Sequence, residues 1–277
     1  MIVAQRGRRT EPRREQGFAL LIVLWSLGLL ALLGTQLTGS ARLQTRLAGN
    51  LRANAIVEAA ADGAAQEAIL RLLQGRWKND DLRRLRVGDA TVEIRLEDQA
   101  GRVNPNATTY PVLQGLLANL GLDQARAAAL AKAIVDWRSG AATLTSGGTK
   151  LDQYRAAGLP YAPSNRPFES IDEMGLVVGM TPDILARLKP YVSVYQEGDV
   201  QRGVAGSVGA QALDEARLAN PQAGSLGFTS ANRVILLRAT AVSGGARFTR
   251  QMVVRIKNDW QPGAAAYQIL TWETGGD

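Results

Sequence analysis

The sequence predicts an α+β fold in which a long N-terminal helix packs on an antiparallel sheet and a large α-helical segment is inserted into that sheet. Three observations support this prediction. An uncharged apolar run near the N-terminus continues into apolar residues at helical spacing, strand-like alternation occurs within residues 87–96 and 234–272, and a block of helical patterns lies between them. A continuous α+β chain without an insertion is the alternative.

The composition argues against an enzyme. The 277 residues include no cysteine and no histidine, which excludes Ser-His-Asp triads, thiolate nucleophiles, His or Cys zinc sites and iron–sulfur clusters. The acidic pairs at 80–81, 97–98 and 172–173 are typical of solvated surfaces. The formal net charge is +7, and residues 1–17 contribute +3 of it, from five arginines and two glutamates. We therefore expect assembly rather than catalysis, with no catalytic residue and no nucleic-acid partner.

The N-terminal region predicts a membrane anchor. No charged residue occurs between Gly17 and Ala41, and an apolar helix needs roughly 20 residues to cross a bilayer. The arginines before this run place the N-terminus in the cytoplasm and the rest of the chain across the membrane, by the positive-inside rule. A cleaved secretory signal is the alternative, although its apolar region is shorter, at roughly 7–15 residues.

The helix is expected to continue beyond the membrane. Leu43, Leu47 and Leu51 recur every four residues, and this apolar stripe extends in the same pattern toward Leu73. No proline interrupts the chain between Glu15 and Asn104. The stripe is therefore a candidate helix interface.

The remaining elements follow from local patterns. Residues 87–96 alternate as a half-buried strand does, and Gly88-Asp89 offers a turn within them. Two further strands joined by Gly244-Gly245 form a hairpin, followed by a third at 267–272. A weak helix is expected within residues 200–219. The block between the strands predicts helices over 113–120, 125–137, 170–174 and 181–188.

The sequence Gln16-Gly17-Phe18 before the apolar run resembles the N-terminus of type IV prepilins and pseudopilins. The resemblance implies that a prepilin peptidase cleaves after Gly17 and methylates Phe18, so that residues 1–17 are a leader and 18–40 the transmembrane helix. Most pilins carry glutamate at the fifth mature position, where it is thought to pair with the N-terminal amine of a neighbouring subunit. Here that position is Ile22, and absence of the glutamate marks the K subunit of the type II secretion system.

Three internal segments resemble the same K class: 98–107 (DQAGRVNPNA), 130–137 (LAKAIVDW) and 154–181, in which Met174 replaces the usual leucine. The resemblance implies a pseudopilin fold with a helical insertion. Its implied divisions are residues 41–104 for the first part of the pseudopilin domain, 105–195 for the insertion and 196–277 for the second part.

The resemblance implies a minor pseudopilin that caps the tip of the type II secretion pseudopilus and helps initiate its assembly for protein export across the outer membrane. Its partners would be other minor pseudopilins, the prepilin peptidase and the inner-membrane assembly platform. The chain would be a single-pass protein of the Gram-negative inner membrane with its C-terminal domain in the periplasm.

Two alternatives concern the insertion. The segment Val178-Gly179-Met180 before a helix looks like a helix-hairpin-helix, which would suit a type IV pilus-like or competence component that binds DNA, but the surrounding residues are acidic. Family members often place acidic residues after the Asp-Trp pair, where calcium can bind. Here Arg138 follows, which leaves Asp136 and Asp152 as weak metal candidates, and we expect Asp136 to face solvent and no cofactor to be bound.

Overall fold

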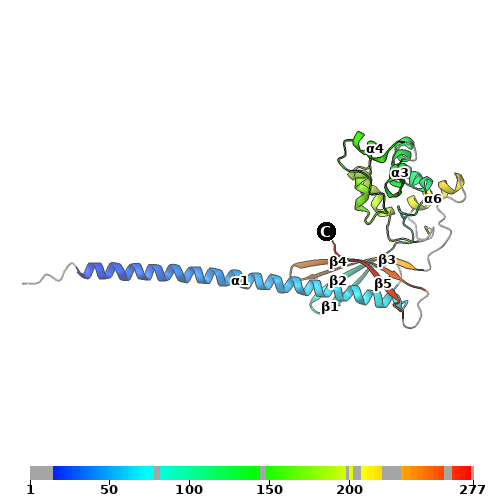
Figure 1. Cartoon of the computed structure of the whole chain (residues 1–277). Coiled ribbons are helices and arrows are strands. Elements are labelled where there is room, and N and C mark those ends of the chain that lie inside the picture. Colours follow the sequence, from blue (N-terminus) through cyan, green and yellow to red (C-terminus); the bar gives the residue numbers. More distant parts are fainter. Residues whose placement is uncertain are drawn as a thin grey trace, which may run out of the picture.

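The computed structural model of the chain describes residues 15–77, 82–141, 143, 148–197, 200–201, 207–219, 232–258 and 264–275. Its longest element is the helix α1 (Glu15–Leu73), whose 59 residues correspond to a length of about 90 Å. In Figure 1 the N-terminal part of α1 extends away from the rest of the molecule, its C-terminal part runs along the sheet, and the helical insertion lies beyond the sheet. The predicted α+β fold is confirmed.

The sheet has five antiparallel strands in the order β1-β2-β3-β4-β5. The turn expected at Gly88-Asp89 is present, with a positive φ of 57° at Gly88, and it joins the expected strand, β2, to a preceding strand, β1, that the sequence pattern did not predict. The Gly244-Gly245 turn is confirmed, with positive φ at both residues, as a two-residue hairpin favours. The strands are β1 (Leu82–Val87), β2 (Ala90–Asp98), β3 (Arg233–Ser243), β4 (Ala246–Ile256) and β5 (Tyr267–Thr274).

One face of α1 is buried on this sheet. The face is rich in alanine, which is the best helix former and lets the helix backbone approach the strands closely. Opposite it lie inward-facing strand residues such as Ile94, Leu96 and Leu237. The buried helix residues are Val57, Ala60, Ala61, Ala64, Ala65, Ala68, Ile69 and Leu72.

The insertion has a second apolar core of its own. Helices near all four predicted positions are present, and Thr181 caps the N-terminus of α5 by accepting from the Ile184 N–H, as its position before Pro182 suggested. Helix α4 was not predicted; the Thr149 side chain caps it. The elements are α2 (Tyr110–Asn119), α3 (Gln124–Arg138), α4 (Lys150–Ala156), η1 (Asp172–Leu176), α5 (Pro182–Leu188), η2 (Lys189–Tyr191) and α6 (Ser207–Ala219).

Helix α6 belongs to the packing of the insertion although it follows residue 195. Its residues Ala212 and Leu213 are fully buried in the insertion core, and α6 packs on α2. At this contact a Cβ added to Gly115 would lie 3.2 Å from the Ala212 carbonyl oxygen, so glycine permits the close approach. The helical unit is therefore longer than the 105–195 expected from the sequence.

Two short chain segments, at residue 103 and at residues 191–193, connect the sheet to the insertion, and we call them the neck. Val103 and Val192 form an isolated parallel bridge, in which the Val103 N–H donates to Tyr191 O at 2.8 Å and the Ser193 N–H donates to Val103 O at 3.0 Å. The outgoing and returning chains therefore lie side by side where the insertion leaves the sheet. The neck follows β2 directly, because Gln99 N–H still bonds to Val234 O of β3.

Candidate assembly surfaces

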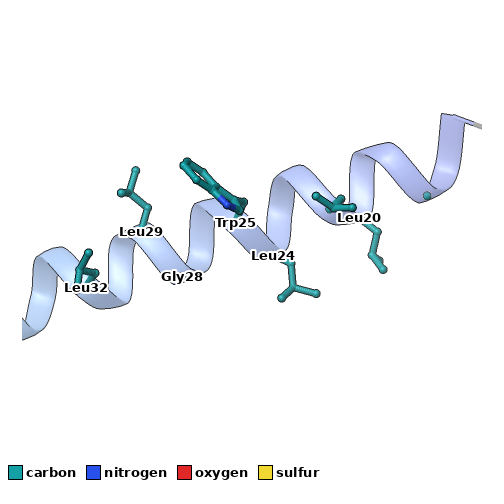
Figure 2. Close-up of a pocket in the computed structure, with 8 residues that line it drawn as sticks. Leu20, Leu24, Trp25, Gly28, Leu29 and Leu32 are labelled. Atoms are coloured by element: carbon teal, nitrogen blue, oxygen red, sulfur yellow. The ribbon is translucent and has the colours of Figure 1, made fainter.

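The first candidate surface is the apolar N-terminal part of α1. The window Gly17–Gly34 has a mean hydropathy of 2.4, and none of it is buried within the molecule. Within the described residues it is the one helical stretch long and apolar enough to cross a membrane. Figure 2 shows Leu20, Trp25 and Leu29 projecting from a single helix, so the hollow drawn there is the surface of one helix. Such side chains need lipid or other helices around them.

The residues assigned to processing lie at the start of this helix. Helix α1 begins at Glu15, before Gly17, and Phe18 is exposed. Ile22 is also exposed on the helix surface, and its carbonyl oxygen accepts a 2.7 Å hydrogen bond from the Ser26 hydroxyl. The roles of Gly17, Phe18 and Ile22 remain predictions from the family pattern.

The second candidate surface is the side of α1 that faces away from the sheet, which we term the outer face. Its described members are Ala55, Ala59, Gly63, Leu70 and Leu73, all exposed. Leu47 and Leu51 are also exposed, but they lie about five helical turns before the buried Ala65 and Ile69 and therefore on the other side of the helix, where the sheet does not reach. Leu51 is 62% exposed, and nothing lies within 4 Å of a Cβ built on Gly63. The Leu43 side chain lies outside the described residues. Small residues on such a face let another helix approach closely.

The predicted stripe toward Leu73 needs one correction. Ile69 and Leu72 are buried on the chain's own sheet, whereas Leu70 and Leu73 belong to the outer face. The sequence presented one apolar pattern, but the helix carries two apolar sides over its C-terminal part. The composition alone could not separate them, because alanine occurs on both.

The insertion leaves the sheet at the end where α1 finishes. Leu72 and Leu73 line a surface hollow together with Arg233 and Ile256, and β2 ends opposite the same end of β3, since Asp98 pairs with Ile235. This end lies roughly 60 Å along α1 from the close of the apolar window at Gly34. A membrane anchor and the bulky helical unit therefore occupy opposite ends of the molecule, as Figure 1 shows.

Comparison with known proteins identifies the class. The family model described as Type II secretion system (T2SS), protein K, matches residues 81–197. The Type II secretion system protein K of Pectobacterium carotovorum subsp. carotovorum is 25% identical over 89% of this chain and 86% of its own length. That of Klebsiella pneumoniae is 29% identical over 69% of this chain and 66% of its own length. This chain is similar to protein K of the type II secretion system.

The fold agrees with this similarity. A solved structure of the GspK-GspI-GspJ complex from the enterotoxigenic Escherichia coli Type 2 Secretion System matches with a TM-score of 0.61 and 19% sequence identity. The match covers 84% of this chain and all of that one. At this identity the likeness shows the fold. The K-type fold predicted from the 98–107, 130–137 and 154–181 patterns is thereby confirmed.

The two metal candidates lie in different surroundings. Asp136 is only 6% exposed, so the expectation that it faces solvent is wrong. Asp152 is exposed at the start of α4, where its Oδ2 accepts from the Thr149 hydroxyl at 2.5 Å and its own N–H donates to Thr149 Oγ1 at 3.2 Å. Among the described residues no three acidic side chains gather closely enough to hold a metal ion.

The acidic pairs serve the fold wherever the structure describes them. Glu97 pairs with Arg102 at 2.7 Å, and Asp98 accepts from the Ala100 N–H. In the second pair, Glu173 Oε1 accepts from the Trp137 indole N–H at 3.1 Å, and Asp172 pairs with Lys189. The pair at 80–81 lies outside the described residues. These contacts give the acids of the two described pairs structural roles.

The hairpin that resembles a DNA-binding unit is engaged in packing. Val178 N–H donates to the buried Tyr154 hydroxyl at 3.1 Å, and Met180 N–H donates to Val177 O at 3.0 Å. A hairpin that grips phosphate directs such backbone N–H groups outward. Gly179 supplies the positive φ of 84° that the turn requires. Two of its N–H groups are thus already used inside the insertion.

Two buried basic side chains were not expected from the sequence. Arg250 of β4 is buried against α1 and binds acidic residues there, and Lys150 of α4 is buried inside the insertion. Arginine and lysine are almost never fully buried unless paired, so composition favours an exposed position for both. For Arg250, the one hint is its position in the strand. It pairs with Ala239 of β3, which is buried, so both side chains lie on the same face of the sheet.

Proposed function

We propose that this chain is the minor pseudopilin that caps the tip of the type II secretion pseudopilus and helps initiate its assembly for protein export across the outer membrane. The observation that carries the proposal is the helical insertion at the end of the molecule opposite the membrane anchor. Another subunit stacked on that end would meet the insertion, whereas subunits below could still pack along α1.

Ile22 supports a terminal position. A carboxylate inside the membrane is costly unless it has a partner, and the family pattern assigns that partner to the amine of a neighbouring subunit. With isoleucine this chain places an apolar side chain there and needs no such neighbour. The chain can therefore occupy the first position of the assembly, where no preceding subunit exists.

The apolar window and the leader support the membrane topology. Five arginines precede Gly17, which favours a cytoplasmic N-terminus with the sheet and insertion on the periplasmic side of the Gram-negative inner membrane. The peptidase that acts at Gly17-Phe18 and the inner-membrane assembly platform are the partners that this arrangement requires.

Other minor pseudopilins are the proposed stable partners. The structural relative was solved as a complex of GspK with GspI and GspJ, and the outer face of α1 offers an unoccupied apolar surface for equivalent helices. Ala55, Ala59 and Gly63 recur every four residues on it, which suits a close helix–helix contact. Leu47 and Leu51, nearer the membrane, offer further exposed apolar side chains on the other side of the helix.

Co-purification tests the proposal. The full-length chain, expressed with its neighbouring minor pseudopilins and extracted in detergent, should elute with them as one complex. The proposal fails if the chain elutes alone while the other subunits assemble. Binding to duplex DNA with a steep salt dependence would instead favour the helix-hairpin-helix alternative. Against that alternative, the basic side chains of Arg187 and Lys189 beside the hairpin already pair with acids.

A further inference from the structure

The insertion contains a buried ammonium group with a complete set of acceptors. Lys150, the first residue of α4, is 3% exposed. Its Nζ donates to Asp136 O at 2.5 Å, Ser139 O at 2.6 Å and Asn165 Oδ1 at 2.8 Å. An ammonium has three N–H donors and no acceptor, so all its hydrogen bonds are made.

Two of the three acceptors lie where a positive charge is favourable. The Asp136 and Ser139 carbonyls lie at the C-terminal end of α3, where helix carbonyls lack intrahelical partners and the helix dipole is negative. Asn165 has a φ of 55° and is the one non-glycine residue with positive φ in the part of the chain that the structure describes. Its contact with Lys150 offsets the cost of that backbone conformation.

A buried carboxylate balances the charge. The Asp136 side chain acts electrostatically on Lys150 and is itself buried. Burial lowers the pKa of the Lys150 ammonium, and the Asp136 carboxylate opposes that effect. Two buried opposite charges with their hydrogen bonds made can persist, whereas either one alone would be strongly destabilising.

A calcium ion does not fit these residues. Calcium takes six to eight oxygen ligands. Here the carbonyl and amide oxygens that could serve already surround a positive charge, and a divalent cation beside the ammonium would be repelled. The second candidate ligand, Asp152, is exposed and bonded to Thr149 instead.

We propose that the Lys150 ammonium occupies the position where a bound metal cation could otherwise lie, and that it holds together α3, α4 and the segment at Asn165. The insertion therefore folds and stays folded without calcium. The proposal concerns the insertion alone and holds or fails independently of the tip role.

A calcium titration tests the proposal on the unmodified chain. Full-length protein in detergent is heated in chelator and in about 5 mM CaCl2, which exceeds the roughly 1 mM dissociation constant of weak extracellular sites. The midpoint of unfolding of the insertion, followed by hydrogen exchange of α3 and α4, should be the same in both. Saturable calcium binding that raises this midpoint would overturn the proposal, since a ligand that binds the folded state stabilises it.

The matched variants are Lys150→Met and Lys132→Met. Lys132 lies exposed on α3, so its replacement should leave the midpoint nearly unchanged. Lys150→Met keeps the length of the side chain but leaves three acceptors and the Asp136 carboxylate without their cation, so the midpoint should fall by about 5 °C or more. Equal midpoints for the two variants would contradict the proposal. If Lys150→Met does not fold, the calcium titration of the unmodified chain still decides.

Discussion

The guanidinium of Arg250 on β4 makes a bidentate ion pair with the carboxylate of Asp62 on α1, with Nε 2.6 Å from Oδ1 and Nη2 3.2 Å from Oδ2. The Arg250 side chain is 8% exposed, and its Nη2 also reaches Glu58. The guanidinium lies over the rings of Phe248 and Trp272 as well. This arrangement fixes the long helix against the sheet, so the direction of the membrane anchor is coupled to the sheet.

Replacing Arg250 should loosen that connection. Arg250→Ala removes a buried side chain and its hydrogen bonds to Asp62 and Glu58, two carboxylates that stay partly exposed to water, so the free energy of unfolding should fall by about 2 kcal/mol. Arg95→Ala, which removes an exposed arginine from β2, is the matched control and should cost less than about 0.5 kcal/mol. Denaturant titration of the two variants checks the difference. Similar losses would mean that the Arg250 contact contributes little.

Replacing Gly63 with a larger residue should weaken assembly with other subunits but not folding. Nothing lies within 4 Å of a Cβ at this position, so Gly63→Leu should fold with an unchanged or slightly higher midpoint. A leucine there would hold a partner helix away from the outer face, and co-purification with the other minor pseudopilins should fall about tenfold or more. Lys132→Leu on the insertion adds the same side chain elsewhere and should leave the complex intact. Full recovery of the complex with Gly63→Leu would exclude this face.

Processing should occur before Phe18. After co-expression with a prepilin peptidase, N-terminal sequencing should begin at Phe18, with a methylated amine. Without the peptidase the chain should retain its leader, which serves as the control. A start at Met1 in the presence of an active peptidase, or near Ser40, would refute the pseudopilin interpretation of the N-terminus.

Tyr154 should make the insertion less stable at alkaline pH. Burial raises the pKa of its hydroxyl to about 12, from an ordinary value of 10.0 in the unfolded chain. The folded state therefore holds the proton more tightly, and the stability present below pH 10 is lost as the pH rises from about 10 to 12. Chemical denaturation across that range should show this loss in the unmodified chain.

Tyr154→Phe is the matched variant. It leaves the Val178 N–H without its buried acceptor, so it should cost about 1–3 kcal/mol at neutral pH. Because it cannot ionise, its deficit relative to the unmodified chain should shrink above pH 10. A deficit that stays constant to pH 12 would show that Tyr154 does not ionise differently in the fold.

Most of the fold could be predicted from the sequence, but its buried polar contacts could not. The β3–β4 hairpin was predictable because Gly244-Gly245 separates two alternating runs, whereas β1 was not, because its LRRLRV sequence is largely exposed and does not alternate cleanly. The buried positions of Asp136 and Lys150 depend on each other across 14 residues of sequence. No local pattern reports such a pair, since each residue alone favours the surface.

The most direct test of the tip role is the position of this subunit on assembled pseudopili. Gold-labelled antibodies against the insertion, applied to pseudopili sheared from cells, should bind at one end of each filament. Antibodies against the major subunit should bind along the whole length and serve as the control. Labelling of the insertion at intervals along the filament would contradict the proposal that this chain ends the assembly.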